Sequence, residues 1–502
     1  MSYSRSLLGC LADFARTRPE SPALVMGTER MTYAELCSMA MSAYRGIEAL
    51  HLPETSRVAL HATKSPRTVA LIVACLLARR PFMLPSTELG ASALDTLLER
   101  AGCTHVLAAD TAEGVGGREV HKIDMTAGPF GMEDLRAKEL APNAVSFIFT
   151  TSGSTGLPKV VPLTFEAVDR FTDWAISQFG IKPGTVVLNY APFNFDLCLL
   201  DIRSTLKAGG TAVLVEPDRA TNGRHLADLL RTHSVEVVQA VPMLFRLLSD
   251  THDGEPFTSV KHVITTGDKV PVRLLPELAR LFPNARFYNV YGSTETNDSF
   301  IHEFTEMLDG DRELPIGRPL PGTDALVLGP DGAVLDGPAT GELLVSTPFQ
   351  THGYAVADGS GTDKFVQLGP DGRQYFRSGD MVRRDDDGVF TLVGRNDSQV
   401  KVRGTRVNLE EIEQVLLAHE QIIGAAVVTV PDDVAGLVIH AVVRRDSPER
   451  KLGVLTLRAY CRDHLPRAAL PTTIQVVDEP LPTTSTGKTD RKAVIRNLLK
   501  GN

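Results

Sequence analysis

Short apolar runs alternate with segments of helical spacing from about residue 20 to residue 350. The helical segments include residues 65–79, 224–232 and 241–249, and each lies between two strand-like runs. This alternation predicts α/β layers with largely parallel sheets. The clearest strand-like runs are residues 58–60, 211–215, 235–241, 262–265 and 287–291.

The pattern changes twice towards the C-terminus. Residues 315–350 consist of short strands separated by Gly/Pro turns, which is typical of a small β-rich subdomain. After Gly394-Arg395-Asn396-Asp397 the pattern restarts as a compact α+β unit, with helices at 409–419 and 455–464, strands at 424–430 and 437–445, and a last helix from about 490. We therefore predict an N-terminal domain over 1–396 and a smaller, mobile C-terminal domain over 397–502.

Composition and charge narrow the class of protein. The chain has 502 residues, 43% of them hydrophobic, and a net charge of −9 that argues against nucleic acid or an anionic membrane as a partner. The longest apolar run, residues 69–78, is too short to span a bilayer. The six cysteines show no metal-binding or disulfide spacing. We expect a cytoplasmic protein that binds neither nucleic acid nor membranes.

A loop rich in hydroxyl groups and glycine joins two apolar runs, residues 145–149 and 160–163, which we expect to be buried strands. The glycines let backbone N–H groups turn inward, and the side chains add hydroxyl donors and one positive charge. These properties favour phosphate binding over the alternative of a flexible linker. The loop departs from the Walker A motif, so a P-loop NTPase is not indicated. The candidate phosphate-binding residues are Thr150, Thr151, Ser152, Gly153, Ser154, Thr155 and Lys159.

Three later segments place reactive side chains at turns. Tyr291 and Glu295 lie at one strand end, where a ring can stack on a base and a carboxylate can hold Mg²⁺, although a capped strand end explains them equally well. Asp380 follows a Gly turn, where it can grip a ribose or belong to an ordinary Ser-Gly-Asp turn. Lys488 lies on a Gly turn before the last helix, and a lone lysine on such a loop is normally only solvated.

In this order, these segments resemble the adenylate-forming superfamily of acyl-CoA synthetases, luciferases and amino-acid adenylation domains. The resemblance covers essentially the whole chain, and it implies ATP and Mg²⁺ as reactants. It rests on the loop at 150–161 together with Met31-Thr32-Tyr33-Ala34-Glu35-Leu36, Gly341-Glu342-Leu343, Arg377-Ser378-Gly379-Asp380, Gly394-Arg395 and Gly487-Lys488.

The resemblance also implies roles for individual residues. The loop would contact the phosphates of ATP and Glu295 the metal ion, Tyr291 would stack on adenine with Asn289 at its edge, and Asp380 and Arg395 would bind ribose. Asp268 stands where the family usually has Glu, and Ser293 replaces a common Pro. The remaining implied ATP-binding residues are Gly267, Asp268, Gly292, Ser293 and Thr294.

Lys488 is implied to be the catalytic lysine that bridges the attacking carboxylate and the α-phosphate. An anion must attack a polyanion here, so positive charge aimed at the pentacoordinate centre lowers the barrier. The C-terminal domain would then rotate about a hinge at Asp397, withdrawing Lys488 and admitting a thiol.

The segment 191–202 indicates which carboxylate is activated. By the resemblance, Asp196 binds the α-ammonium group of an amino acid, which would give a buried carboxylate a paired charge. The alternative is that Asp196 only N-caps a helix running from 197 toward Lys207. Asp298 would be a second pocket carboxylate that must meet a donor, stay wet or hold its proton, and it hints at a small or polar amino acid. The implied pocket is lined by Leu197, Leu200, Gln239, Ile264, Thr266, Val290, Asp298 and Ser299.

The leading hypothesis is therefore a stand-alone ligase that forms an aminoacyl-AMP and transfers the amino acid to the phosphopantetheine thiol of a carrier protein. Because the chain ends at Asn502, shortly after Lys488, we expect that carrier on a separate chain. The runner-up is an acyl- or aryl-CoA ligase that uses coenzyme A as the acceptor. A catalytically silent nucleotide-binding homologue is a third possibility, and retention of Lys488, Glu295, Asp380 and Lys159 argues against it.

Overall fold

A computed structural model gives the fold, and by its internal contacts the chain divides into two compact units. The first comprises 1–85, 100–150 and 160–396, and the second comprises 86–99, 151–159 and 397–502. No helix among the described residues is long and apolar enough to cross a membrane. The structure describes residues 6–86, 89–109, 115, 118–126, 128, 140–151, 159–251, 254–271, 274–304, 313–355, 362–369, 372–395, 399–402, 404–432, 436–447, 452–482 and 491–500.

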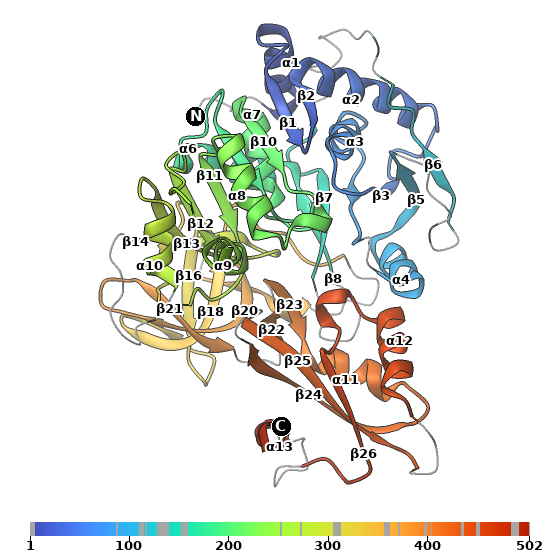
Figure 1. Ribbon diagram of the computed structural model, residues 1–502, viewed down its shortest axis with the longest axis vertical. Coiled ribbons are helices and arrows are strands. Elements are labelled where there is room, and N and C mark those ends of the chain that lie inside the picture. The colour runs from blue at the N-terminus through green and yellow to red at the C-terminus, as the bar shows by residue number, and fades with distance from the viewer. Residues whose placement is uncertain are drawn as a thin grey trace. The chain divides into compact units, whose positions relative to one another are not determined.

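A nine-stranded sheet forms the centre of the first unit (Figure 1). Its middle strands, from β13 to β10 and on to β1, are parallel, and antiparallel strands close both edges. Their carboxyl ends therefore meet at one edge of the sheet, where ligands of such sheets bind. In spatial order the strands are β15 (Arg318–Pro319), β14 (Asn297–Phe304), β13 (Arg286–Ser293), β12 (His262–Thr266), β11 (Val237–Ala240), β9 (Val186–Asn189), β10 (Thr211–Leu214), β1 (Pro22–Met26) and β2 (Glu29–Thr32).

Alternate residues of these strands enter two separate cores, as the pleat of a strand requires. Val238 and Val263 pack with helices α8 (Gly223–Thr232), α9 (Pro242–Thr251) and α10 (Leu275–Leu281). Their neighbours Val237 and Ile264 face the other core. That core contains buried residues of α1 (Leu7–Thr17), α2 (Tyr33–Glu48), α3 (Pro66–Leu77), α6 (Phe165–Phe179) and α7 (Thr205–Ala208).

A second sheet of the first unit packs into this same core. Local signals in the sequence start its helices: Thr32 and Glu35 form a capping box on α2, and Ser65 caps α3 ahead of Pro66. The six strands, in spatial order, are β6 (Val120–Lys122), β5 (Cys103–Ala108), β3 (Arg57–His61), β4 (Phe82–Met83), β7 (Val145–Thr151) and β8 (Lys159–Thr164). Helix α4 (Ala91–Ala101) follows β4 in the chain.

A β-rich part completes the first unit, with its strands paired antiparallel. Its longest strand, β20, pairs with β18, β19 and β21, and the register places Asp380 opposite Arg395. Its strands are β17 (Val334–Leu335), β16 (Asp324–Leu328), β18 (Ala339–Ser346), β20 (Arg373–Arg384), β19 (Phe365–Leu368) and β21 (Phe390–Arg395).

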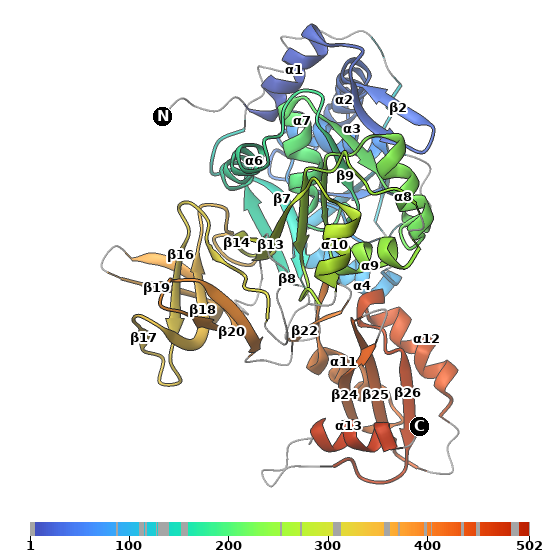
Figure 2. The same ribbon diagram turned by 60° about the vertical axis from the view of Figure 1, so that its left-hand side comes forward.

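The main part of the second unit is a three-stranded sheet between helices (Figure 2). Val427 packs with α11 (Leu409–Leu417) and α12 (Val454–His464), whereas its neighbours Ala426 and Val428 pack with α13 (Arg491–Lys500). The strands are β24 (Ile422–Asp432), β25 (Gly436–Arg445) and β26 (Thr473–Val477), and a hairpin of β22 (Gln399–Val402) and β23 (Thr405–Asn408) precedes them.

The predicted α/β class with a β-rich part and an α+β C-terminal region is confirmed. Three elements differ from the sequence pattern. The β22–β23 hairpin lies in residues 399–408, and β26 follows α12; neither is among the strands predicted above. The helix expected from 197 toward Lys207 starts at Leu199 and is a π-helix, η1 (Leu199–Ser204), that continues into α7.

Candidate active site

The predicted pocket residues of three neighbouring strands lie side by side at the carboxyl edge of the nine-stranded sheet. Gln239 at the end of β11 pairs in register with Asn189 of β9 on one side and with Ile264 of β12 on the other. Thr266 pairs with Val290 of β13 in the same way. All five side chains are buried. The parallel register therefore brings together residues that are far apart in the sequence.

Asp201 of η1 lies at the centre of a buried polar network against this edge. Its carboxylate accepts hydrogen bonds from Asn189 Nδ2 at 3.1 Å and Gln239 Nε2 at 3.0 Å, and the side chain is fully excluded from solvent. Burial raises the pKa of Asp201 well above its ordinary value, while these hydrogen bonds and the charge of Lys64 oppose that shift. The two amide donors match an ionised carboxylate, which can only accept.

Lys64 is the cation of this network. Its Nζ donates to the carbonyl oxygens of Asn189 at 2.9 Å and Tyr190 at 3.1 Å, and the side chain is 9% exposed. Burial lowers the pKa of Lys64 to about 7, against the opposing charge of Asp201. The network thus holds one buried acid and one buried base, and the charge of each favours the ionised form of the other.

Asp196 lies in the turn that leads into η1. The helical segment begins at Leu199 with Cys198 as its N-cap, and that cap has no side-chain hydrogen bond. The backbone carbonyl of Asp196 accepts from Leu199 N at 2.9 Å, and its side chain is half-buried. Asp196 therefore lies directly before the helical stretch, and its backbone carbonyl already accepts a bond from it.

Asp298 is the second residue of β14, just after the turn of the β13–β14 hairpin. Gly292 is opposite it in the ladder, and a Cβ at Gly292 would come within 2.3 Å of the carbonyl oxygen of Asn297, so the hairpin closes only around glycine. The carboxyl group of Asp298 is half-buried. Burial, and to a lesser extent the negative charge of Asp196, raise the pKa of Asp298 to about 7. At neutral pH Asp298 therefore holds its proton part of the time.

Ser299 is fully buried beside Asp298. Its hydroxyl is bonded within the hairpin, at 3.0 Å from Thr296 Oγ1 and 3.1 Å from the carbonyl oxygen of Asn297. Of the other predicted pocket residues, Leu200 is fully buried and Leu197 half-buried.

Glu295, the predicted metal ligand, lies in the turn of the same hairpin. It is 1% exposed, and its Oε1 accepts a hydrogen bond from Tyr354 Oη at 2.7 Å. Its backbone carbonyl accepts from Thr351 N at 2.9 Å. No group of three or more metal-ligating His, Cys, Asp or Glu side chains occurs in the part of the chain that the structure describes. A single carboxylate still fits Mg²⁺, because this ion is commonly bound by one or two carboxylates plus substrate phosphates.

The residues predicted to bind adenine and ribose meet through their side chains. Tyr291 Oη donates to Asp380 Oδ2, and Arg395 Nη1 donates to Asp380 Oδ1. Arg395 Nη2 also donates to the carbonyl oxygen of Ser378 at 3.1 Å. Burial, followed by the charge of Asp380, raises the pKa of Tyr291 well above its ordinary value, so the hydroxyl group keeps its proton. The Asp380 carboxylate thus joins β13 to the β-rich part.

The remaining nucleotide candidates are placed as follows. Asn289 Nδ2 donates to the carbonyl oxygen of Pro315 at 2.7 Å. Gly267 has φ +81° directly after β12, and Asp268 Oδ1 accepts from Lys269 N at 2.8 Å. Ser293 and Thr294 are half-buried at the hairpin turn. Thr150, Thr151 and Lys159 lie at the ends of β7 and β8, whereas Ser152, Gly153, Ser154, Thr155, Asp397 and Lys488 lie outside the described residues.

Four polar residues of this site carried no prediction: Lys64, Asn189, Asp201 and Tyr354. Asp201 lies five positions after Asp196 in a segment already singled out, so a charged residue within an apolar run was the available signal. The other three come from separate parts of the chain, and no local pattern marks them.

Comparison with known families gives the site its context. The model of the AMP-binding enzyme family matches residues 11–355, and the model of the AMP-binding enzyme C-terminal domain matches residues 411–488. The chain belongs to the AMP-binding enzyme family. Membership places it in the adenylate-forming superfamily and implies ATP as a reactant.

Curated relatives of this AMP-binding enzyme include ligases and parts of larger synthases. The L-proline--[L-prolyl-carrier protein] ligase of Pseudomonas fluorescens is 33% identical over 72% of this chain and 70% of its own length. The D-alanine--D-alanyl carrier protein ligase of Bacillus licheniformis is 26% identical over 97% of this chain and 98% of its own. Phenyloxazoline synthase MbtB of Mycobacterium sp. is 31% identical over 96% of this chain, but the chain spans only 41% of that protein.

The fold is shared with solved adenylation domains. The adenylation domain AlmE of Vibrio cholerae, solved in complex with glycyl-adenosine-5′-phosphate, superposes with a TM-score of 0.86 at 23% identity. The match covers 100% of this chain and 98% of AlmE. This similarity establishes the fold of the AMP-binding enzyme.

Proposed function

We propose that this AMP-binding enzyme activates an amino acid with ATP and transfers it to the phosphopantetheine thiol of a separate carrier protein. The observation that carries the proposal is the placement of Asp196. It is a half-buried carboxylate in the turn before η1, next to Leu197, whose carbonyl oxygen accepts from Gln239 at the carboxyl edge of the sheet. Two of the relatives named above are carrier-protein ligases for amino acids, which supports the same substrate class.

The proposed first step forms a mixed anhydride. An oxygen of the amino-acid carboxylate attacks the α-phosphorus of ATP, the bond from that phosphorus to the β-phosphate oxygen breaks, and pyrophosphate leaves. Asp196 pairs with the α-ammonium group and so orients the carboxylate. Asp380 and Arg395 hold the ribose, and Tyr291 the adenine ring. Lys488, carried over from the resemblance, supplies positive charge to the transition state.

Mg²⁺ is part of the proposal, with Glu295 as its protein ligand. The metal would neutralise charge on the phosphates of ATP. The hydrogen bond from Tyr354 to Glu295 Oε1 fixes the orientation of this carboxylate, as outer-shell partners of metal ligands do.

The proposed second step forms a thioester. The thiol of the phosphopantetheine group loses its proton to solvent as its sulfur attacks the acyl carbon. The bond from that carbon to the phosphate oxygen breaks, and AMP leaves. For this step the C-terminal domain, residues 397–502, would turn about Asp397 and withdraw Lys488.

Substrate-dependent exchange of labelled pyrophosphate into ATP tests the first step. We expect exchange with one or a few members of a panel of proteinogenic amino acids, D-alanine and glycine. Asp196→Ala should abolish it, because the α-ammonium group loses its counter-charge. Asp250→Ala is the matched control, since Asp250 lies at an exposed position of α9 and pairs only with Arg246 among the contacts in the described chain.

The same purified enzyme can be used to identify the acceptor and to distinguish the proposed function from the competing ones. Exchange only with fatty or aryl acids would replace the proposal by the acyl- or aryl-CoA ligase, and no exchange with any acid would favour a silent homologue. With an active amino acid, thioester formation on a phosphopantetheinylated carrier protein but not on coenzyme A supports the second step. Thioester formation on coenzyme A alone contradicts it.

A further inference from the structure

The two amides that bind Asp201 also bind the segment that carries Asp196. Gln239 Nε2, besides its bond to Asp201, donates to the carbonyl oxygen of Leu197 at 3.1 Å. Asn189 Nδ2, besides its bond to Asp201, donates to the carbonyl oxygen of Ala191 at 3.2 Å. The two tied carbonyl groups lie on either side of Asp196 in the chain.

Lys64 adds further ties at the start of the same segment, through the carbonyl oxygens of Asn189 and Tyr190. Within the segment the backbone bonds are turn-like, from Phe195 N to Pro192 O and from Cys198 N to Phe195 O. No strand or helix is assigned between β9 and η1, so side chains replace the ladder that would otherwise hold these residues.

The helical segment that contributes Asp201 begins directly after the turn. The carbonyl oxygen of Leu197 accepts from Leu200 N at 3.2 Å and Asp201 N at 3.3 Å, in addition to Gln239. The helical segment continues as the π-helix η1. Such π-helical turns are rare and are found frequently at functional sites. Leu197 O is therefore the point where the turn, the helix and the sheet edge meet.

We propose that Asp201 is the positioning residue of the amino-acid site: its carboxylate sets the orientation of Gln239 and Asn189, and these two amides set the turn that presents Asp196. This inference rests on the proposed function, because it requires that Asp196 bind the substrate. Asp201 does not touch the substrate in this scheme.

The chemistry of the network makes the carboxylate hard to replace. Both oxygens of Asp201 accept from amide N–H groups, and a carboxylate has no donor of its own. Asparagine at 201 has the same shape, but its NH₂ group must face the NH₂ group of either Asn189 or Gln239. One amide must then turn, and its bond to Ala191 O or Leu197 O is lost with it.

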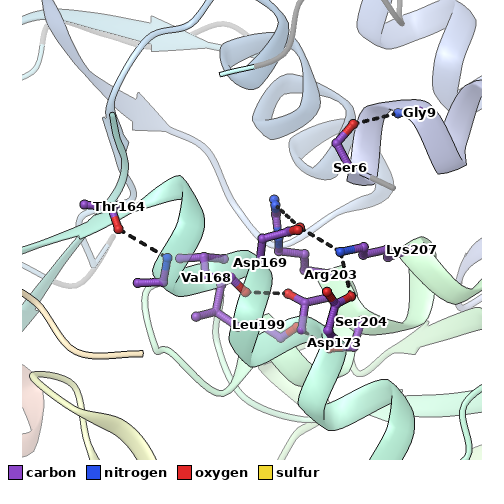
Figure 3. Close-up of polar contacts among 12 residues, drawn as sticks. Ser6, Gly9, Thr164, Val168, Asp169, Asp173, Leu199, Arg203, Ser204 and Lys207 are labelled. Carbon is purple, nitrogen blue, oxygen red and sulfur yellow. Dashed lines mark hydrogen bonds and ion pairs between the residues drawn. The ribbon is translucent and has the colours of Figure 1, made fainter. Parts of the chain in front are cut away.

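A second charged network on the same helical stretch provides the control (Figure 3). Arg203 and Lys207 face Asp169 of α6, at 3.4 Å and 2.8 Å, and Lys207 also pairs with Asp173 at 2.7 Å. Asp169→Asn weakens the attachment of η1 and α7 to α6 but leaves the contacts of Asp201, Gln239 and Asn189 described above in place.

The experiment compares Asp201→Asn and Asp169→Asn in the full chain, with the amino acid that gives the fastest exchange with the wild-type enzyme. We expect Asp201→Asn to raise the KM for that amino acid about tenfold to a hundredfold, with the KM for ATP within about twofold of wild type. Asp169→Asn should leave both constants unchanged, even where the two variants have similar melting temperatures.

Unchanged amino-acid KM in Asp201→Asn, or an equal rise in Asp169→Asn, would overturn the positioning role. Equal rises in the KM for ATP and for the amino acid would do the same, because they indicate general damage. If Asp201→Asn does not fold, Asn189→Ala is the deciding variant, because it keeps the bond from Gln239 to Asp201. The inference then requires a rise in the KM for the amino acid that is smaller than that expected for Asp201→Asn, with the KM for ATP unchanged. A wild-type enzyme without exchange on any amino acid refutes the proposed function instead.

Discussion

Two charged networks hold the helical stretch Leu199–Ala208, and they do so by different chemistry. Toward α6, Arg203 and Lys207 meet Asp169 and Asp173 as direct ion pairs, and the Asp173 side chain is 38% exposed (Figure 3). Toward the sheet, Asp201 is fully buried and is bound by the neutral amides of Asn189 and Gln239.

This difference determines which parts of the structure each network can hold in a defined position. In the network toward α6, Arg203 and Lys207 are buried, but their carboxylate partners are partly exposed, at 16% for Asp169 and 38% for Asp173. Water and the neighbouring carboxylate can therefore replace part of a lost contact. A buried carboxylate bound by amides has no such substitute, since each lost bond leaves a polar group unsatisfied. The network toward α6 is therefore suited to attachment, and the network toward the sheet is suited to setting side-chain and loop positions.

The most severe test of the comparison is Lys64→Met. We expect a loss of about 3 kcal/mol in the free energy of unfolding. The variant removes the Lys64 donor from the Tyr190 carbonyl and one of the two donors from the buried Asn189 carbonyl, which keeps Val215 N, and it removes the cation near Asp201. Urea unfolding of the purified variant measures it. A loss below about 1 kcal/mol would mean that the buried network is no more demanding than a surface pair.

The second test uses the proton of Asp298, whose pKa is raised to about 7 mainly by burial. The unfolded chain loses this proton near pH 4 and the folded chain only near pH 7, so the folded state binds more protons between these values. The contribution of the Asp298 carboxyl group to the free energy of unfolding of the wild type is therefore present at low pH and is lost as the pH rises to about 7. Asp298→Asn does not titrate.

We expect the stability of Asp298→Asn relative to wild type to increase by about 1–2 kcal/mol between pH 5 and pH 8, allowing for partial solvent access. Melting temperatures of both proteins at the two pH values give the result. A stability difference that is the same at both pH values would show that Asp298 ionises normally in the folded protein.

A substitution in the network toward α6 should lower the free energy of unfolding less than Lys64→Met does. Asp169→Asn removes the charge shared by the buried Arg203 and Lys207. We expect it to cost about 1–2 kcal/mol, since Lys207 keeps Asp173 and the asparagine oxygen, at a position that is 16% exposed, can still accept from Arg203. Urea unfolding in low and high salt measures the loss and its screening. A cost as large as that of Lys64→Met would remove the distinction between the two networks.

The smallest effect is expected at the edge of that network. Asp173→Asn changes a side chain that is 38% exposed, so the free energy of unfolding should change by no more than about 0.5 kcal/mol. The melting temperature should stay within about one degree of wild type. A larger loss would indicate that Asp173, rather than Asp169, is the main partner of Lys207.

Local sequence signals account for most of the elements around the site. Residues 262–265 and 287–291 were predicted as strands from their apolar runs and are β12 and β13. The helix predicted at 224–232 is α8, which begins after an Asn222 cap. These predictions succeed because burial periodicity and capping depend on neighbours within a few positions.

The helix expected after Asp196 shows where local signals stop. Its residues are helical, but the start at Leu199 and the π geometry of η1 differ from the α-helix expected from residue 197. The carbonyl of Leu197 is shared between the helix and Gln239 of β11, which is 42 positions away. A pattern of neighbouring residues contains no information about such a partner.

The sequence by itself determined the α/β layers, the order of motifs and, through the ordered set of motifs, the adenylate-forming family. Tertiary structure alone decided that Lys64, Asn189, Gln239 and Asp201 form one network, and that Asp380 joins Tyr291 to Arg395. The physical reason is the range of the forces involved. Periodicity records which side chains are buried, whereas the register of parallel strands and the need to satisfy buried polar groups decide which distant side chains meet.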